Sequence, residues 1–217
     1  MILIFAAPAF AESRLSHQER LDLESRFSQK QKETRFLKTE FRQTLQLEGL
    51  NKPVVSRGEF FFQAPDRLKL EYTQPAGELA LLRDGALVLK KNGRLLVKKQ
   101  LQSSQAVDSV ALLQRFFTDL TAGWDEDYDV SVWRRGEKIA VVLERKGEPQ
   151  RGQPAKIETL LTGRDLELQS VRVALGEGNE LFYEFFNVRR NASFDEAIFA
   201  WPKEDNAPRR LKQKGGR

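Results

Sequence analysis

The side chains that most often carry out catalysis are scarce in this sequence. Cysteine is absent and His17 is the only histidine, so cysteine chemistry is excluded and a histidine-based triad or metal site has little material. Asp125, Glu126 and Asp127 form a charge run, which is typical of a solvated loop. No nucleophile elbow, phosphate-binding loop or metal-ligand spacing occurs. We therefore expect a protein that binds rather than catalyses, without a cofactor or metal.

The net charge of +5 and the pI of about 9.4 raise the question of nucleic-acid binding. Residues 203–217 contain six basic and two acidic side chains, so this segment accounts for most of the excess. Lys90-Lys91 and Lys98-Lys99 fall at expected hairpin edges, where lysines oppose edge-to-edge aggregation. We therefore expect no nucleic-acid partner, and we interpret residues 203–217 as a basic flexible tail.

Residues 1–11, MILIFAAPAFA, form an apolar run that ends in small side chains. Ala9-Phe10-Ala11 fits the rule for cleavage by signal peptidase, and the run is shorter than the roughly 20 apolar residues that span a bilayer. The basic residues that usually precede such a run are missing, which a start codon upstream of Met1 would explain. We predict a signal peptide and a soluble exported protein. The alternative is a hydrophobic N-terminal tail that does not act as a targeting signal.

Two periodicities alternate along the rest of the chain. Residues 13–34 and 104–121 fit amphipathic helices. The other segments alternate apolar and polar residues between turns such as Asp84-Gly85 and Asn92-Gly93, which favour tight hairpins. Because β-α-β alternation is absent, we predict one mainly-β domain over residues 12–202, with about eleven antiparallel strands in a barrel or strongly bent sheet. The expected strands are 39–47, 54–63, 68–72, 79–82, 87–90, 95–99, 128–133, 139–145, 156–161, 166–175 and 181–188.

The strand faces expected to point inward are apolar. They carry Phe60, Phe62, Leu68, Leu70, Tyr72, Leu81, Leu87, Leu89, Val141 and Leu143. The helix over 104–121 would close one mouth of the barrel with Phe116, Phe117 and Leu120. From the pattern alone, this interior is either a packed core or a lipid cavity. A palmitoyl chain would gain about 10 kcal/mol on entering such a cavity, because each buried methylene contributes ~0.8 kcal/mol.

Several short motifs follow one another in a familiar order. Residues 58–75 read GEFFFQAPDRLKLEYTQP, residues 36–43 read FLKTEFRQ, and the Asp84-Gly85 turn precedes Leu87-Val88-Leu89. Near the end, Phe194-Asp195 is followed by Phe199-Ala200-Trp201-Pro202. Taken together over residues 20–202, these motifs resemble the outer-membrane lipoprotein carrier (LolA-like) family. Leu70, Val88 and Leu89 stand where that family has aromatic residues, so the chain looks like a divergent member.

The resemblance implies a half-open β-barrel of eleven strands with an N-terminal helix and a helical lid. It implies a monomeric periplasmic carrier that binds the acyl chains of lipoproteins, or another lipid. Such a carrier would receive its cargo from an inner-membrane transporter and pass it to an outer-membrane receptor. The alternative is an envelope regulatory or structural module on the same scaffold, which binds a protein partner without carrying lipid.

The resemblance also implies a role for Lys69. In the family, a basic residue on the third strand holds the lid shut through hydrogen bonds to the lid backbone, and Lys69 occupies that position in place of the usual Arg. Lysine keeps the charge but lacks the planar guanidinium. Lys69 is therefore either a latch for the lid or an exposed strand lysine.

Overall fold

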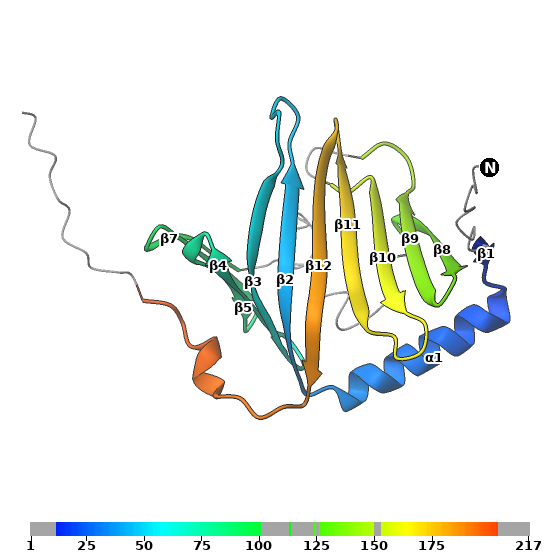
Figure 1. Ribbon diagram of the computed structural model, residues 1–217, viewed down its shortest axis with the longest axis horizontal. Helices are drawn as coiled ribbons and strands as arrows, with labels where there is room; N and C mark the ends of the chain where they lie inside the picture. The colour runs from blue at the N-terminus through cyan, green and yellow to red at the C-terminus, as the bar shows by residue number, and fades with distance from the viewer. Residues whose placement is uncertain (1–11, 101–112, 114–123, 125, 150–152, 204–217) are drawn as a thin grey trace, which may run out of the picture.

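The computed structural model describes residues 12–100, 113, 124, 126–149 and 153–203. Its twelve strands form one curved antiparallel sheet (Figure 1). The strands are β1 (Glu12–Arg14), β2 (Phe36–Gln46), β3 (Val54–Gln63), β4 (Arg67–Gln74), β5 (Ala76–Arg83), β6 (Ala86–Lys91), β7 (Arg94–Gln100), β8 (Tyr128–Arg135), β9 (Lys138–Arg145), β10 (Lys156–Thr162), β11 (Leu168–Gly176) and β12 (Asn179–Arg190). Their spatial order is β1-β8-β9-β10-β11-β12-β2-β3-β4-β5-β6-β7. The edge strands β1 and β7 do not pair with each other, so the sheet is open.

Helix α1 (His17–Glu33) lies across the ends of β10 and β11 (Figure 1). It begins with a capping box, in which the Ser16 hydroxyl accepts a hydrogen bond from the Glu19 amide and the Glu19 carboxylate accepts one from the Ser16 amide. Leu23 and Phe27 are four residues apart, so they share one face, and both are buried. The expected first helix is therefore confirmed, although it starts at His17 rather than at residue 13.

The two predicted hairpin turns have the expected backbone geometry. Asp84 and Gly85 have φ of 52° and 70°, and Asn92 and Gly93 have φ of 50° and 76°. Positive φ at both central residues gives a two-residue turn a twist that matches the right-handed twist of the two strands it connects. These turns connect β5 to β6 and β6 to β7.

The predicted mainly-β, half-open fold is confirmed. All eleven expected strands occur, as β2 to β12, with bounds that differ from the prediction by a few residues at most. Strand β1 was missed, because its three residues are all exposed and have no apolar periodicity. The expected helix over 104–121 lies outside the described residues except for Leu113, which is helical and buried.

Apolar side chains form two separate clusters, one on each face of the sheet. The inner cluster contains buried side chains from β2 to β6, β8 to β12 and α1, together with Leu113, Trp124 and Leu166. The outer cluster contains Phe36, Phe61, Leu81 and Phe199, and it packs under the short 3-10 helix η1 (Glu196–Phe199). The sheet therefore separates a large inner apolar surface from a small outer one.

Gly58 in β3 lies where the neighbouring strands leave no space for a side chain. A Cβ atom at this residue would collide with the carbonyl oxygen of Glu71 on β4 and lie 2.8 Å from the Phe41 ring on β2. The register between β3 and β4 also shifts beside it, between Arg57 and Gly58. The glycine therefore allows three neighbouring strands to approach closely where the sheet bends.

Gly58→Ala is expected to lower the free energy of unfolding by about 1–3 kcal/mol, because relieving the collision requires the backbone to shift. Chemical denaturation would measure the change. Ser56→Ala in the same strand is the control, and its cost should stay within about 0.5 kcal/mol. Equal costs for the two variants would contradict the close approach at Gly58.

Candidate functional site: the inner face of the sheet

Most residues predicted to line an apolar interior do lie together on the inner face. Seven of them are buried members of the inner cluster, and Tyr72 and Leu89 are partly buried against it. The seven are Phe60, Phe62, Leu68, Leu70, Leu87, Val141 and Leu143. They belong to one apolar cluster, because pairing in register brings the inward-facing residues of adjacent strands into rows across the sheet.

One such row crosses five strands. Leu37 lies opposite Phe62, Phe62 opposite Leu68, Leu68 opposite Leu82, and Leu82 opposite Leu87. All five side chains are almost completely buried. The row shows how the inward-facing side chains of successive strands become a continuous apolar surface once the register is set.

The second half of the inner face was largely missed by the sequence analysis. Strands β8 to β12 supply inner-cluster residues that include Val132, Ile157, Val171, Val173 and Leu181. Their alternation was visible in the sequence, for example at Ile157 and Leu161, but the prediction named only Val141 and Leu143. The apolar surface therefore extends over both halves of the sheet.

Aromatic rings occupy the middle of the inner face, where the two halves meet. The Phe41 ring centroid lies 5.3 Å from that of Tyr72 and 6.1 Å from that of Tyr183, with edge-to-face geometry in both pairs. Phe185 lies 5.8 Å from Phe60 and stacks on Tyr183 at 6.2 Å. These five rings belong to β2, β3, β4 and β12, so they hold the central strands together on the inner side.

Polar groups on the inner face are few, and most have partners. The Tyr72 hydroxyl donates to Gln43 Oε1 at 2.7 Å. The Thr39 hydroxyl donates to the carbonyl oxygen of Phe186 at 2.6 Å. Thr159 is also fully buried, but its hydroxyl has no hydrogen-bond partner.

Leu81 does not lie on the inner face, and the prediction that placed it there is wrong. It belongs to the outer cluster with Phe36, Phe61 and Phe199. Its neighbours Ala80 and Leu82 belong to the inner cluster, as alternation along β5 requires. The sequence from Leu79 to Leu82 is apolar on both faces, so alternation could not reveal which face was which.

Lys69 also faces outward, since it pairs in register with Phe61 and Leu81. Its ammonium group lies 2.8 Å from the Glu71 carboxylate, and only 12% of its side chain is exposed. Leu113, the described residue of the expected lid helix, is in the inner cluster. Lys69 therefore lies on the face opposite Leu113, and its role as a latch stays a prediction because the rest of the expected lid lies outside the described residues. Phe116, Phe117 and Leu120, predicted to form the lid, lie outside the described residues.

Helix α1 is attached to the sheet by basic side chains near its C-terminal end. Arg26 donates to the Arg164 carbonyl oxygen at 3.0 Å, and Lys30 donates to that of Asp165. Both carbonyls belong to the connection between β10 and β11. Burial lowers the pKa of the Lys30 ammonium group, and the positive charge of Arg190 lowers it further.

Arg190, at the end of β12, strengthens the same junction. Its guanidinium donates to the Thr34 hydroxyl at 2.9 Å and lies 3.8 Å from the Glu167 carboxylate. Burial lowers the pKa of Arg190, and the negative charge of Glu167 opposes this effect. These contacts fix α1 over one end of the inner face.

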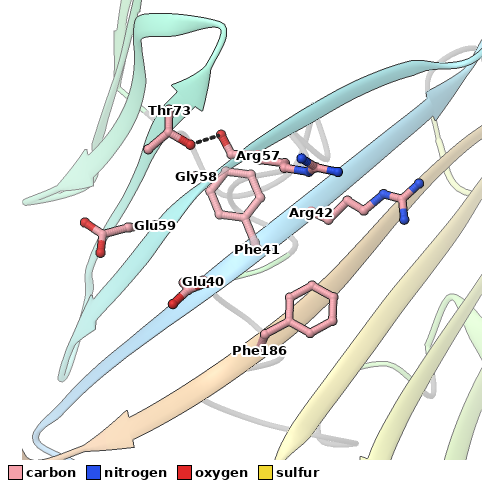
Figure 2. A pocket seen from close by; sticks show the side chains of 8 residues that line it. All are labelled: Glu40, Phe41, Arg42, Arg57, Gly58, Glu59, Thr73 and Phe186. Atoms are coloured by element: carbon pink, nitrogen blue, oxygen red, sulfur yellow. Dashed lines mark hydrogen bonds between the residues drawn. The ribbon is translucent and has the colours of Figure 1, made fainter.

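A groove of about 510 Å³ opens on the outer face, over β12, β2, β3 and β4 (Figure 2). Glu59 is paired with Lys38 at 2.5 Å, and Glu40 accepts a hydrogen bond from the Asn187 amide at 3.0 Å. Arg42 and Arg57 lie directly opposite each other in the β2–β3 ladder. The lining residues are Glu40, Phe41, Arg42, Arg57, Gly58, Glu59, Thr73 and Phe186.

Two further searches of the described part of the chain gave negative results. Its helices are too short and too polar to cross a membrane. Over the same residues, His, Asp and Glu side chains do not gather in groups of three or more that could hold a metal ion.

The sequence matches the family model of the outer membrane lipoprotein carrier protein LolA over residues 32–202, so the chain belongs to this family. A search of curated proteins found no significant match.

Solved structures with a similar fold share little sequence with this chain. A LolA superfamily protein from Nitrosomonas europaea is 11% identical, with a TM-score of 0.43 over 82% of this chain and 97% of that one. The MucA/MucB complex of Pseudomonas aeruginosa is 15% identical, with a TM-score of 0.49 over 85% and 61%. The Mycobacterium tuberculosis lipoprotein LppX is 11% identical, with a TM-score of 0.41 over 83% and 100%.

The outward position of Lys69 gives a testable expectation. Lys69→Gln keeps most of the side-chain length but removes the ion pair with Glu71, and because only 12% of the Lys69 side chain is exposed it should lower the free energy of unfolding by about 1–2 kcal/mol. Hydrogen exchange at the Leu113 amide should rise no more than this loss of global stability requires, because Lys69 lies on the opposite face. Faster exchange at Leu113 than the loss of global stability explains would support the latch hypothesis.

Proposed function

We propose that the protein is a periplasmic carrier whose inner face binds the acyl chains of lipoproteins, or of another lipid, and shuttles them towards the outer membrane. The observation that carries this proposal is the continuous apolar inner face of an open sheet, formed by ten of its twelve strands. Membership of the lipoprotein carrier family supports it.

The binding energy would come from apolar surface rather than from directional contacts. Each methylene transferred from water contributes ~0.8 kcal/mol, so a single long acyl chain supplies enough free energy for stable binding. A chain lying against rows such as Leu37–Phe62–Leu68–Leu82–Leu87 would contact aliphatic and aromatic carbon along several strands. Catalytic groups are not required for this activity.

The route of the cargo is part of the same proposal. The chain would be exported and lose residues 1–11, which would leave Glu12, the first residue of β1, as its N-terminus. An inner-membrane transporter would supply the acylated cargo and an outer-membrane receptor would accept it. Phe116, Phe117 and Leu120 remain predicted to cover the bound chain.

A charged side chain on the rim of the inner face should block lipid uptake. Leu89 is partly buried against the inner cluster, so Leu89→Glu would place a carboxylate beside the bound chain without disturbing the fully buried residues. Uptake of a fluorescent fatty acid is expected to fall about tenfold or more, because an ionised group next to apolar cargo loses its hydration. Fluorescence titration would measure the change.

Leu79→Glu provides a matched control for this experiment. Leu79 lies on the adjacent strand and is also partly buried, but it packs against the outer cluster. Uptake by this variant should match that of the unmodified protein. The proposal is contradicted if the unmodified protein takes up no lipid, or if the two variants lose uptake equally.

The outer groove favours a second candidate function, the binding of a protein partner. Phe186 is 46% exposed in this groove. Arg57 has no ion-pair partner among the described residues, and it lies opposite Arg42, a juxtaposition of like charges that is unfavourable in an isolated sheet. An exposed aromatic ring beside an unpaired guanidinium suits a partner that presents apolar and acidic side chains.

A photo-crosslinking residue at position 186 would test this second function in cells. We expect one discrete adduct, which should weaken at least about fivefold when Arg57→Glu reverses the charge of the groove. The same crosslinker at exposed Leu21 on α1 serves as the control. Adducts that are equal at both positions, or insensitive to Arg57→Glu, would rule out a specific partner at this groove.

A further inference from the structure

Apart from tryptophan and tyrosine, three residues with polar side chains are buried in the described part of the chain, and all three are threonines. Thr34 donates to the Lys30 carbonyl oxygen at 2.8 Å and accepts from Arg190 at 2.9 Å. Thr39 donates to the Phe186 carbonyl oxygen at 2.6 Å. Thr159 is the exception, because its hydroxyl has no hydrogen-bond partner although its exposed fraction is 0%.

The position of Thr159 makes this exception informative. It lies in the middle of β10, opposite Val141 on β9 and Val171 on β11, and both valines are inner-cluster residues. Ile157 and Leu161, two residues away on either side, face the same way. The Thr159 side chain is therefore directed into the face proposed to bind lipid, with aliphatic carbon as its neighbours.

Neighbouring backbone groups do not satisfy this hydroxyl. Strand β10 pairs with β9 on one side and with β11 on the other, and the Thr159 hydroxyl makes no hydrogen bond to the backbone of either neighbour. A buried hydroxyl without a partner destabilises the folded state, whereas a valine has nearly the same shape and carries no such penalty. The hydroxyl therefore disfavours the ligand-free protein, and a group that arrives with a ligand would remove the penalty.

We propose that Thr159 donates a hydrogen bond to the carbonyl oxygen of an acyl ester bound against the inner face. This inference rests on the proposed lipid-carrier function and narrows its cargo to lipids whose polar ester group enters the apolar interior. An ionised carboxylate would lose its hydration there, so a neutral ester carbonyl suits the site better. Thr159 is thus a specificity residue that distinguishes an acyl ester from a plain hydrocarbon chain.

Two competing ligands and two variants of the full chain at position 159 would test this proposal. The fluorescent apolar probe N-phenylnaphthylamine would be displaced either by methyl dodecanoate or by tetradecane, a hydrocarbon with the same number of chain atoms. Thr159→Val should weaken displacement by the ester about three- to tenfold, the value of one neutral hydrogen bond. Displacement by tetradecane should not change. Thr159→Ser should retain the affinity for the ester.

The stability of the ligand-free protein provides a second, independent measurement. Thr159→Val removes an unsatisfied hydroxyl, so Tm should rise by about 2–4 °C. Thr39→Val is the matched control, because it removes a hydroxyl that is hydrogen-bonded on the same face. Its Tm should fall, and its ratio of ester to hydrocarbon affinity should not change.

The outcomes separate the two proposals. If neither ligand displaces the probe from the unmodified protein and the protein takes up no fluorescent fatty acid, the carrier function itself fails. If both ligands displace it but Thr159→Val changes their affinities equally or not at all, only the role of Thr159 is overturned. A fall in Tm for Thr159→Val would also overturn it, because a buried water would then already satisfy the hydroxyl.

Discussion

Strand β2 pairs with β12 from Gln46 opposite Glu180 to Leu37 opposite Arg190. In the described sheet this ladder alone joins the meander β2–β7 to the meander β8–β12. More than 100 residues separate its strands along the chain, so its formation closes a long loop and carries an entropic cost. The aromatic contacts of Phe41, Tyr183 and Phe185 on the inner side help to offset that cost. Without this ladder the inner face would consist of two separate surfaces, one on each meander.

The outer cluster explains how a sheet with one large apolar face can tolerate apolar side chains on the other. Phe61 and Leu81 face outward, and they are covered by Phe199 and the rest of the segment that follows β12. Arg83 supports this cover by donating to the Phe199 carbonyl oxygen at 3.2 Å. The chain thus uses its C-terminal segment to bury the apolar part of the outer face, and the larger apolar surface remains on the inner side.

Local sequence signals predicted the strands well because each signal has a local physical cause. The positive φ at Asp84-Gly85 and Asn92-Gly93 is a property of the turn itself, and the alternation of Leu68, Leu70 and Tyr72 is a property of a single strand. The errors came from facts that no single strand contains. Leu81 lies in a run that is apolar on both faces, and only the contact with Phe199 shows which side it occupies. The unsatisfied hydroxyl of Thr159 depends on the side chains opposite it on two other strands, and these could not be assigned before the register was known.

Charged side chains on the outer face help to decide which face becomes the inner one. Glu40, Glu59 and Glu71 lie opposite one another on β2, β3 and β4, an arrangement that is repulsive by itself. Lys38 contacts Glu59 at 2.5 Å and Lys69 contacts Glu71 at 2.8 Å, so the neighbouring row compensates part of this repulsion. A slip of one residue in β3 would separate Lys38 from Glu59 and turn Phe60 and Phe62 towards solvent. The Lys38–Glu59 pair contributes little to stability by itself, but it opposes the same misregistration that burial of the phenylalanines opposes. Lys69 therefore has a structural role that accounts for its charge on this strand: it helps to keep the outer face polar and the inner face apolar.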